Sequence, residues 1–197
     1  MIVVTTPMCK EIVEWAGLAD FKVNKHPDNE DGDFAILLSE SKTDMDSLAI
    51  KLNTFSQIAQ SIIAVSNSLY DKGLIEDRVS YDDVNRIFED LDSEFINSWF
   101  EDMDTIRNSN SGKSVKVYSE FLKDIVKDIG AKIVDSKAVD GYDYVVYPDY
   151  LTDKVKSSED IDDDSLTFIE IPTHGNVSKS PVERAQQRYS ILVYSLQ

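Results

Sequence analysis

The sequence predicts an α/β fold in which a sheet of about six mostly parallel strands is flanked by helices. Short β-branched or apolar runs alternate with longer segments whose apolar residues recur at three and four residues, the spacing of a helix face. Glycine follows several of the longer segments, as it does at helix C-caps. The chain has 197 residues, of which 42% are hydrophobic and 29% charged, so its composition is that of a globular protein with enough apolar material for a core.

The N-terminal part predicts three strands and one helix. Residues 2–6 form a β-branched run that is typical of a strand. Pro7 suits the first turn of the helix that follows, and Gly17 ends this helix as a C-cap. Residues 21–24 predict a second strand. Residues 34–38 are almost continuously apolar, which is typical of a strand that is covered on both faces.

The middle of the chain predicts three helices. Residues 44–72 have apolar side chains at helical spacing and are followed by a glycine. Ser80 opens the second helix, with Asp83 three residues later in a pattern close to a capping box. Ser114 is expected to cap the third helix, which Gly130 ends.

The C-terminal part predicts strands at residues 131–134, 142–147 and 166–171. An acidic loop at residues 150–165 separates the second of these strands from the third. A capping box with proline at the first helical position opens a final helix over residues 181–196.

A faint internal repeat relates residues 10–38 to residues 123–147. Each copy is a helix ending in glycine, then a short strand, a turn, and an apolar strand entered through aspartate. The repeat predicts two related Rossmann-like halves within a single α/β domain over residues 1–197, and chance similarity of two such segments is the alternative. The halves would be residues 1–41 and 114–197, bridged by helices over residues 44–106.

Charge and composition exclude several classes of protein. The formal net charge is −17, with 37 acidic and 20 basic residues, and such a surface repels nucleic acid and anionic membranes. No run of 18 apolar residues predicts a membrane span, and the N-terminus has no signal-peptide pattern. Cys9 is the single cysteine, so an internal disulfide is impossible. These features predict a cytoplasmic protein that binds neither nucleic acid nor membrane.

The candidate ligand-binding residues follow the predicted strands, because ligands of open α/β sheets bind beyond the carboxyl ends of the strands. Turn formation and helix capping are the alternative role of such residues. His174 is the strongest single candidate, since imidazole can act as an acid, a base or a metal ligand. The candidates are Thr5, Thr6, Ser39, Glu40, Asp149, Thr173, His174 and Asn176.

Two apparent cofactor motifs do not hold. Residues 109–114 look like a phosphate-binding loop, but Arg107 stands where the first glycine belongs and a helix is predicted before it. The acidic run that begins at Asp160 looks like a calcium loop, but Ser165 and Ile171 replace its glycine and its final glutamate. The sequence therefore identifies no cofactor and no set of metal ligands.

Two resemblances narrow the expected class of protein. The start of the chain, with a strand, Pro7, then residues 11–13 and Gly17, resembles the metal-chelate receptors that bind vitamin B12 and siderophores. Residues 5–7, 33–40, 48–53 and 171–176 resemble the methanogenesis marker group, whose members are small proteins restricted to methanogenic archaea. The resemblances imply a receptor-like α/β architecture and an accessory role in methanogen coenzyme or metal-cofactor metabolism.

Three functions are compatible with these observations. The first is a cytosolic accessory protein that holds a small molecule, a metal cofactor or a tetrapyrrole-type ligand between the two halves. The second is a small enzyme in which His174 works with Asp149 or Glu40 as acid and base. The third is a protein-interaction module whose acidic helical surface, over residues 82–104, binds a basic partner.

Overall fold

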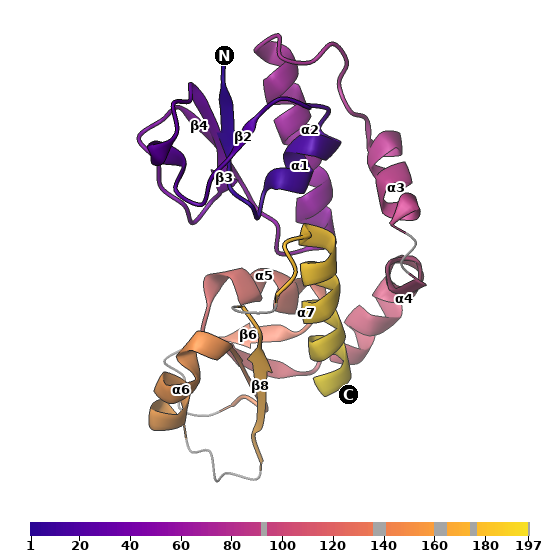
Figure 1. Ribbon diagram of the computed structural model, residues 1–197. Coiled ribbons are helices and arrows are strands. Elements are labelled where there is room, and N and C mark those ends of the chain that lie inside the picture. The colour runs from indigo at the N-terminus through magenta and orange to yellow at the C-terminus, as the bar shows by residue number, and fades with distance from the viewer. Residues whose placement is uncertain (92–93, 136–140, 160–164, 174–176, 197) are drawn as a thin grey trace. The chain divides into compact units, whose positions relative to one another are not determined.

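The computed structural model forms two compact units (Figure 1). Unit 1 consists of Met1–Ser93 with Lys179–Glu183, and unit 2 consists of Glu94–Ser178 with Arg184–Gln197. For residues 94–100 the backbone alone is described. The structure describes residues 1–91, 94–135, 141–159, 165–173 and 177–196.

The sheet of unit 1 has four parallel strands in the order β2-β1-β3-β4. Parallel strands that are buried on both faces have continuous apolar sequences. Strand β3 has such a sequence, and its first four residues are buried. The edge strand β4 instead alternates between exposed and covered positions and ends on buried Ile50. The strands are β1 (Val3–Thr5), β2 (Lys22–Val23), β3 (Phe34–Leu38) and β4 (Ser47–Ile50).

Helices α1 and α2 pack against each other beside this sheet, and α3 contacts α2 (Figure 1). Thr54 caps α2 by accepting a hydrogen bond from the backbone N–H of Gln57 at 3.1 Å. The buried stripe of α2 includes Ile58, Ile62 and Val65. The helical elements are α1 (Lys10–Trp15), the 3-10 turn η1 (Pro27–Asn29), α2 (Phe55–Asp71) and α3 (Tyr81–Asp90).

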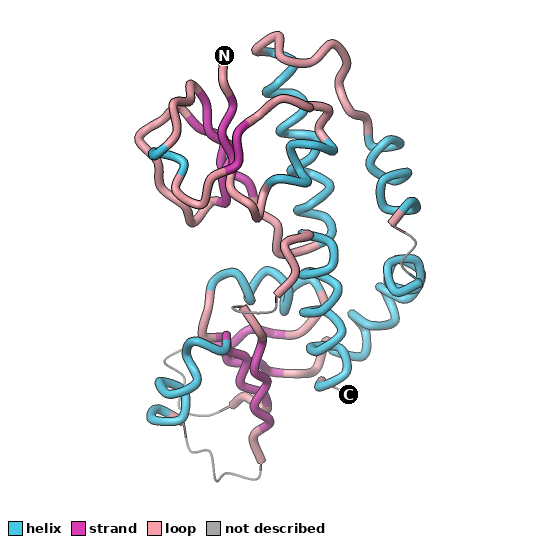
Figure 2. The backbone as a smooth tube through the Cα atoms, in the orientation of Figure 1, coloured by secondary structure: helices cyan, strands magenta, loops and turns pink. Residues whose placement is uncertain are grey.

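The sheet of unit 2 repeats this topology. Its four strands are again parallel, in the order β6-β5-β7-β8 (strands coloured magenta in Figure 2). In both sheets the first strand of the unit is central, and the second and third strands lie on either side of it. The strands are β5 (Ser114–Val117), β6 (Lys132–Val134), β7 (Tyr144–Pro148) and β8 (Thr167–Ile171).

The helices of unit 2 cover this sheet. Val155 of α6 packs with Val145 and Tyr147 of β7 in one apolar cluster. The helix α7 packs on α5, where the Tyr189 hydroxyl donates a hydrogen bond to Asp128. The helical elements are α4 (Glu94–Asn110), α5 (Glu120–Asp128), the 3-10 turn η2 (Asp149–Leu151), α6 (Thr152–Ser158) and α7 (Pro181–Ser195), which begins in unit 1.

Matching hydrogen bonds occur at the start of each sheet. In unit 1 the N–H of Asp33 donates to the carbonyl of Ile2 at 2.8 Å, and the N–H of Ile2 donates to the Asp33 carboxylate at 2.6 Å. In unit 2 the N–H of Asp143 donates to the carbonyl of Ser114 at 2.9 Å, and the N–H of Ser114 lies 3.5 Å from the Asp143 carboxylate. In each predicted repeat, the aspartate before the apolar strand thus bonds to the equivalent residue at the start of the first strand of its unit.

Both repeats also end their helix on a glycine with positive φ. Gly17 has φ +98° and Gly130 has φ +85°, a conformation that glycine adopts without strain. A Cβ atom at Gly130 would lie 2.6 Å from the carbonyl oxygen of Arg107, whereas a Cβ at Gly17 would make only ordinary contacts with Ile75. Glycine is therefore required at Gly130 by both conformation and space.

The prediction of one sheet with about six strands was wrong. The described residues form two sheets with four strands each, and β4 and β5 supply the strands that the prediction missed. The segment 44–72 was expected to be one helix, but its start forms β4, because Ser47–Ile50 pairs with β3 over four residues. Local helical spacing at Leu48 is overridden by this long-range pairing.

Two other predicted elements also differ. Ser114 begins the strand β5 and caps no helix, since Val115 and Val117 place β-branched side chains at period two in a central strand. The helix starts later, after Ser119. The acidic segment 150–165, expected to be a loop, contains α6.

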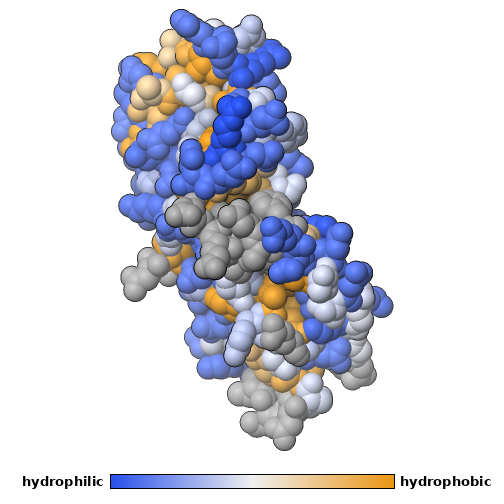
Figure 3. Space-filling model, turned by 90° about the vertical axis from the view of Figure 1, so that its right-hand side faces the viewer, coloured by the Kyte–Doolittle hydropathy of each residue, from blue (hydrophilic) through white to orange (hydrophobic). Residues whose placement is uncertain are grey.

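The segment that begins at Ser80 was predicted to form one helix, but the described residues form two, α3 and α4. The capping box of Ser80 and Asp83 is present at the start of α3. No helix in the described part of the chain is long and apolar enough to cross a membrane. Hydrophilic residues cover most of the face drawn in Figure 3, as expected from the excess of acidic residues. The strands predicted at residues 2–6, 21–24, 34–38, 131–134, 142–147 and 166–171 and the helix at 181–196 are confirmed with shifts of one or two residues.

Candidate functional site

The predicted site residues of unit 1 have different surroundings. Thr5 is fully buried, and its hydroxyl donates to the carbonyl of Ile36 at 2.7 Å, so it joins β1 to β3. Thr6, one residue later, lines a pocket at the ends of the strands. Ser39 and Glu40 are exposed in the turn after β3.

In unit 2 the structure brings two predicted site residues together. The backbone N–H of Thr173 donates to one carboxylate oxygen of Asp149 at 3.0 Å, and the Thr173 hydroxyl donates to the other oxygen. The N–H of Tyr150 also donates to Asp149, at 2.9 Å. The ends of β7 and β8 are therefore joined through Asp149. His174 and Asn176 lie outside the described residues.

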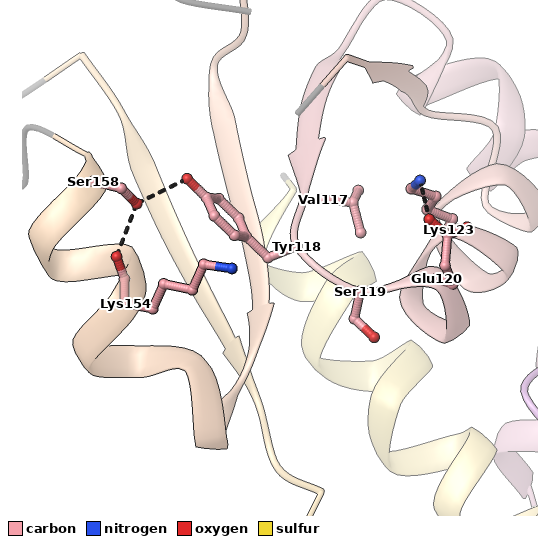
Figure 4. Close-up of a pocket in the computed structure, with 7 residues that line it drawn as sticks. All are labelled: Val117, Tyr118, Ser119, Glu120, Lys123, Lys154 and Ser158. Atoms are coloured by element: carbon pink, nitrogen blue, oxygen red, sulfur yellow. Dashed lines mark hydrogen bonds and ion pairs between the residues drawn. The ribbon is translucent and has the colours of Figure 1, made fainter. Parts of the chain in front are cut away.

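A pocket of about 430 Å³ lies at the carboxyl end of β5 (Figure 4). This volume falls in the range of small-molecule sites. One side of the pocket comes from the end of β5 and the first turn of α5, and the other comes from α6. The lining residues are Val117, Tyr118, Ser119, Glu120, Lys123, Lys154 and Ser158.

Two polar groups in this pocket are available to a ligand. Ser119 is the N-cap of α5, but its side chain makes no capping hydrogen bond. Among the described residues, no hydrogen bond or ion pair engages the Ser119 hydroxyl or the Lys154 ammonium group. Lys123 differs, since its ammonium group lies 2.5 Å from Glu120. Figure 4 shows Lys154 extending from α6 on the same side as the Tyr118 ring.

A buried charge cluster lies directly behind Tyr118. The Lys116 ammonium group is 2.7 Å from the Glu159 carboxylate, and the two side chains are only 8% and 3% exposed. The Tyr142 hydroxyl donates to Glu159 at 2.7 Å, and the Tyr118 hydroxyl donates to the same carboxylate. Ser158, from the last turn of α6, lies 3.1 Å from the Tyr118 hydroxyl. Tyr118 therefore contacts both the pocket and the ion pair.

The ion pair holds its two members in their charged forms. Burial alone would lower the pKa of Lys116, but the hydrogen bonds to Glu159 and Tyr142 outweigh it and raise this pKa above its ordinary value. Burial alone would raise the pKa of Glu159, but the hydrogen bonds from Lys116, Tyr118 and Tyr142 lower it overall. Burial, followed by the hydrogen bond to Glu159, raises the pKa of both tyrosines. Such shifts beside a pocket are a feature of functional sites and also of structural ion pairs.

The sequence reasoning missed this cluster. Lys116 stands between two valines in a short run that was assigned to a helix, and its partner Glu159 is far away in the sequence. A period-two interpretation of residues 114–117 would have predicted the strand, but with Lys116 on the face opposite the two valines, which would be taken as exposed. The local pattern could therefore have found β5 but not the buried ion pair.

No group of three or more His, Cys, Asp or Glu side chains in the described residues is arranged to hold a metal ion. Cys9 is buried at the start of α1. His26 is exposed in the turn after β2.

No protein-family model matches this chain, and no curated protein matches it. Solved structures with the same architecture do exist. The laminin-binding protein of Streptococcus agalactiae, described as an adhesin with metal-transporting activity, has a TM-score of 0.59 and 8% identity, with 100% of this chain and 98% of that chain covered. The periplasmic metal-binding protein of Candidatus Liberibacter asiaticus has a TM-score of 0.56 and 9% identity, with both chains fully covered.

The manganese-bound form of the latter protein gives a TM-score of 0.58 at 8% identity, again over both whole chains. At such identity the likeness establishes the fold alone. This chain therefore has the α/β architecture of metal-binding receptor proteins, with two four-stranded parallel sheets. The receptor-like architecture expected from the N-terminal segment is confirmed at this level.

Proposed function

We propose that this chain is a binding protein for a small polar ligand, which it holds in the pocket at the end of β5. The observation that carries the proposal is the position of this pocket. In the order β6-β5-β7-β8 the chain goes from β5 to β6 on one side, and β7 lies on the other side of β5. The end of β5 is thus a topological switch point, the place where open parallel sheets bind ligands.

The lining of the pocket supports a ligand with an acidic group. The Lys154 ammonium group supplies positive charge, and the Ser119 hydroxyl supplies a hydrogen-bond donor from the opposite side. The Tyr118 ring offers an apolar wall, and its hydroxyl is already engaged by Glu159. A carboxylate or phosphate between Lys154 and Ser119, with the rest of the molecule against Tyr118, uses each of these groups.

A metal cofactor or tetrapyrrole-type ligand, as proposed from the sequence, would suit this pocket if it carries a carboxylate group. The solved neighbours bind or transport metals, which supports a ligand-binding role for this architecture. In this pocket, however, the ammonium group of Lys154 would repel a bare metal cation, and the carboxylate of Glu120 is already paired with Lys123. A cytoplasmic location and a place in methanogen coenzyme metabolism remain proposals, and so do the acidic interaction surface and catalysis by His174.

Native mass spectrometry of protein purified from its own host tests the proposal, together with thermal melts in a panel of small carboxylates and phosphate esters. A bound ligand raises the melting temperature, because it stabilises only the folded state. We expect Lys154→Ala to remove this rise, and Ser119→Ala to reduce it. Lys156→Ala is the matched control, since Lys156 is an exposed lysine of the same helix that does not line the pocket.

Two outcomes would contradict the proposal. One is the absence of both a co-purifying molecule and any rise in melting temperature across the panel. The other is a rise that Lys154→Ala and Lys156→Ala reduce equally, because this would show a general effect of charge and no site.

A further inference from the structure

A second pocket lies at the carboxyl ends of the strands in unit 1, with a volume of about 630 Å³. Its lining comes from the ends of three adjacent strands. Thr6 follows β1, Lys25 and His26 follow β2, and Ser41 and Lys42 follow β3. This is the edge of a parallel sheet at which ligands bind.

The basic groups of this pocket have no acidic partner within the part of the chain that the structure describes. Among the described residues, no hydrogen bond or ion pair engages the ammonium groups of Lys25 and Lys42 or the imidazole ring of His26. Acidic residues outnumber basic ones by 37 to 20 in this chain, so a lysine has many carboxylates with which it could pair. Two neighbouring lysines that lack such a partner among the described residues are therefore notable. Other lysines of unit 1 do have partners at 3.3 to 3.6 Å: Lys10 with Glu14, Lys22 with Glu30 and Lys72 with Asp46.

Asp28, an acidic residue of the lining, has its carboxylate engaged elsewhere. Its Oδ1 atom accepts two hydrogen bonds, one from the Thr43 hydroxyl and one from the Asp44 N–H at 3.2 Å. These bonds join the turn after β2 to the segment after β3. They therefore hold the segments that carry His26 and Lys42 against the same pocket.

The loop after β2 is also held in place. The N–H of Asn24 donates to the carbonyl of Thr5 at 2.9 Å, and the Asn24 side-chain amide donates to Glu30 at 2.7 Å. Pro27 is buried at the start of η1. The backbone that carries Lys25 and His26 is thus pre-organised, which reduces the entropy lost on binding.

We propose that this pocket is an anion-binding site that takes a phosphate or carboxylate group. The two ammonium groups supply positive charge and N–H donors, the imidazole supplies a further N–H donor, and the hydroxyls of Thr6 and Ser41 supply O–H donors. A compact oxyanion accepts several such hydrogen bonds at once. The site is distinct from the unit 2 pocket, and it stands or falls independently of the proposed function.

The test is titration of the full chain with inorganic phosphate and, separately, with citrate, at low and constant ionic strength. Amide chemical shifts in the NMR spectrum report the location of binding. We expect shifts at residues 6, 25, 26, 28, 29, 41 and 42, and the anion with the lower Kd identifies the preferred group. Lys25→Gln with Lys42→Gln should weaken binding by about tenfold or more, since each substitution removes a charge-assisted hydrogen bond.

Lys156→Gln, which removes one exposed positive charge in unit 2, is the control and should leave the Kd unchanged. Melting temperatures confirm that the variants are folded. The proposal is overturned if neither anion binds the wild-type chain below about 10 mM. It is also overturned if the double variant binds as tightly as the wild type, or if the control variant weakens binding equally.

Discussion

Units 1 and 2 have the same sheet topology, but one buried position in the central strand is apolar in unit 1 and charged in unit 2. Val4 of β1 pairs with Ala35 of β3, and Lys116 of β5 pairs with Val145 of β7 at the matching register. Val4 is buried among apolar neighbours, whereas Lys116 is buried with Glu159 as its partner. The same backbone therefore accepts an apolar residue or an ion pair, provided that the charge is matched.

The two units also differ in where their positive charge lies. In unit 2, Lys116 is neutralised behind the pocket, and Tyr118 separates it from the ligand space. In unit 1, Lys25 and Lys42 face the pocket directly. The comparison teaches that topology determines where a pocket forms, while the side chains at the strand ends determine what it can bind.

The largest expected effect is on the ion pair. Glu159→Gln leaves the Lys116 charge buried without a counter-charge, and we expect the free energy of unfolding to fall by about 3–5 kcal/mol. Hydrogen exchange should show reduced protection of the backbone amides of β5 and β7, while the protection of the β1 amides stays unchanged. The double variant Lys116→Met with Glu159→Gln should regain most of the stability. A loss below about 1 kcal/mol in the single variant would show that the pair is solvated.

The glycines that end the two repeated helices give the next effect. Gly130→Ala must place a methyl group against the Arg107 carbonyl at an unfavourable φ, so urea unfolding should show a loss of about 3 kcal/mol. Gly17→Ala carries only the conformational cost, about 1 kcal/mol. Equal losses at the two positions would mean that the backbone near Arg107 relaxes freely.

Removal of a single hydroxyl should have a smaller effect. Tyr118→Phe deletes one hydrogen bond to Glu159, while Lys116 and Tyr142 continue to hold the carboxylate. We expect a loss of about 1 kcal/mol in urea unfolding. A loss as large as that of Glu159→Gln would show that Tyr118 is essential to the pair.

The smallest expected effect is the change of the free energy of unfolding with pH, over the pH range in which the chain stays folded. The pKa of Glu159 is lowered in the folded state, so its contribution is present above the unfolded pKa and is lost as the pH falls through the folded pKa. The pKa values of Lys116 and Tyr118 are raised, so their contributions are lost as the pH rises through the folded values. Stability measured by urea unfolding should thus decline at acidic and alkaline pH. Lys116→Met with Glu159→Gln should flatten both declines.

The sequence predicted the strands that are continuous apolar runs, because burial on both faces leaves a local signal. It did not predict β4, whose Ser47–Ile50 segment is a strand only because β3 lies beside it. The hydrogen bonds between Thr173 and Asp149 follow from parallel strands that end at one edge of the sheet. The pairing of Lys116 with Glu159 depends on tertiary contact between β5 and the end of α6, which no local pattern encodes.

The strand pairs of each sheet come from one continuous stretch of chain, so the order of synthesis bears on folding. All four strands of unit 1 are complete by Ile50, long before Ser114 of unit 2 is made. Because domains fold as units during synthesis, the first sheet can assemble before the second exists. Ser180, whose hydroxyl donates to Glu11 at 2.8 Å, adds its contact to unit 1 only after all four strands of unit 2 have been made.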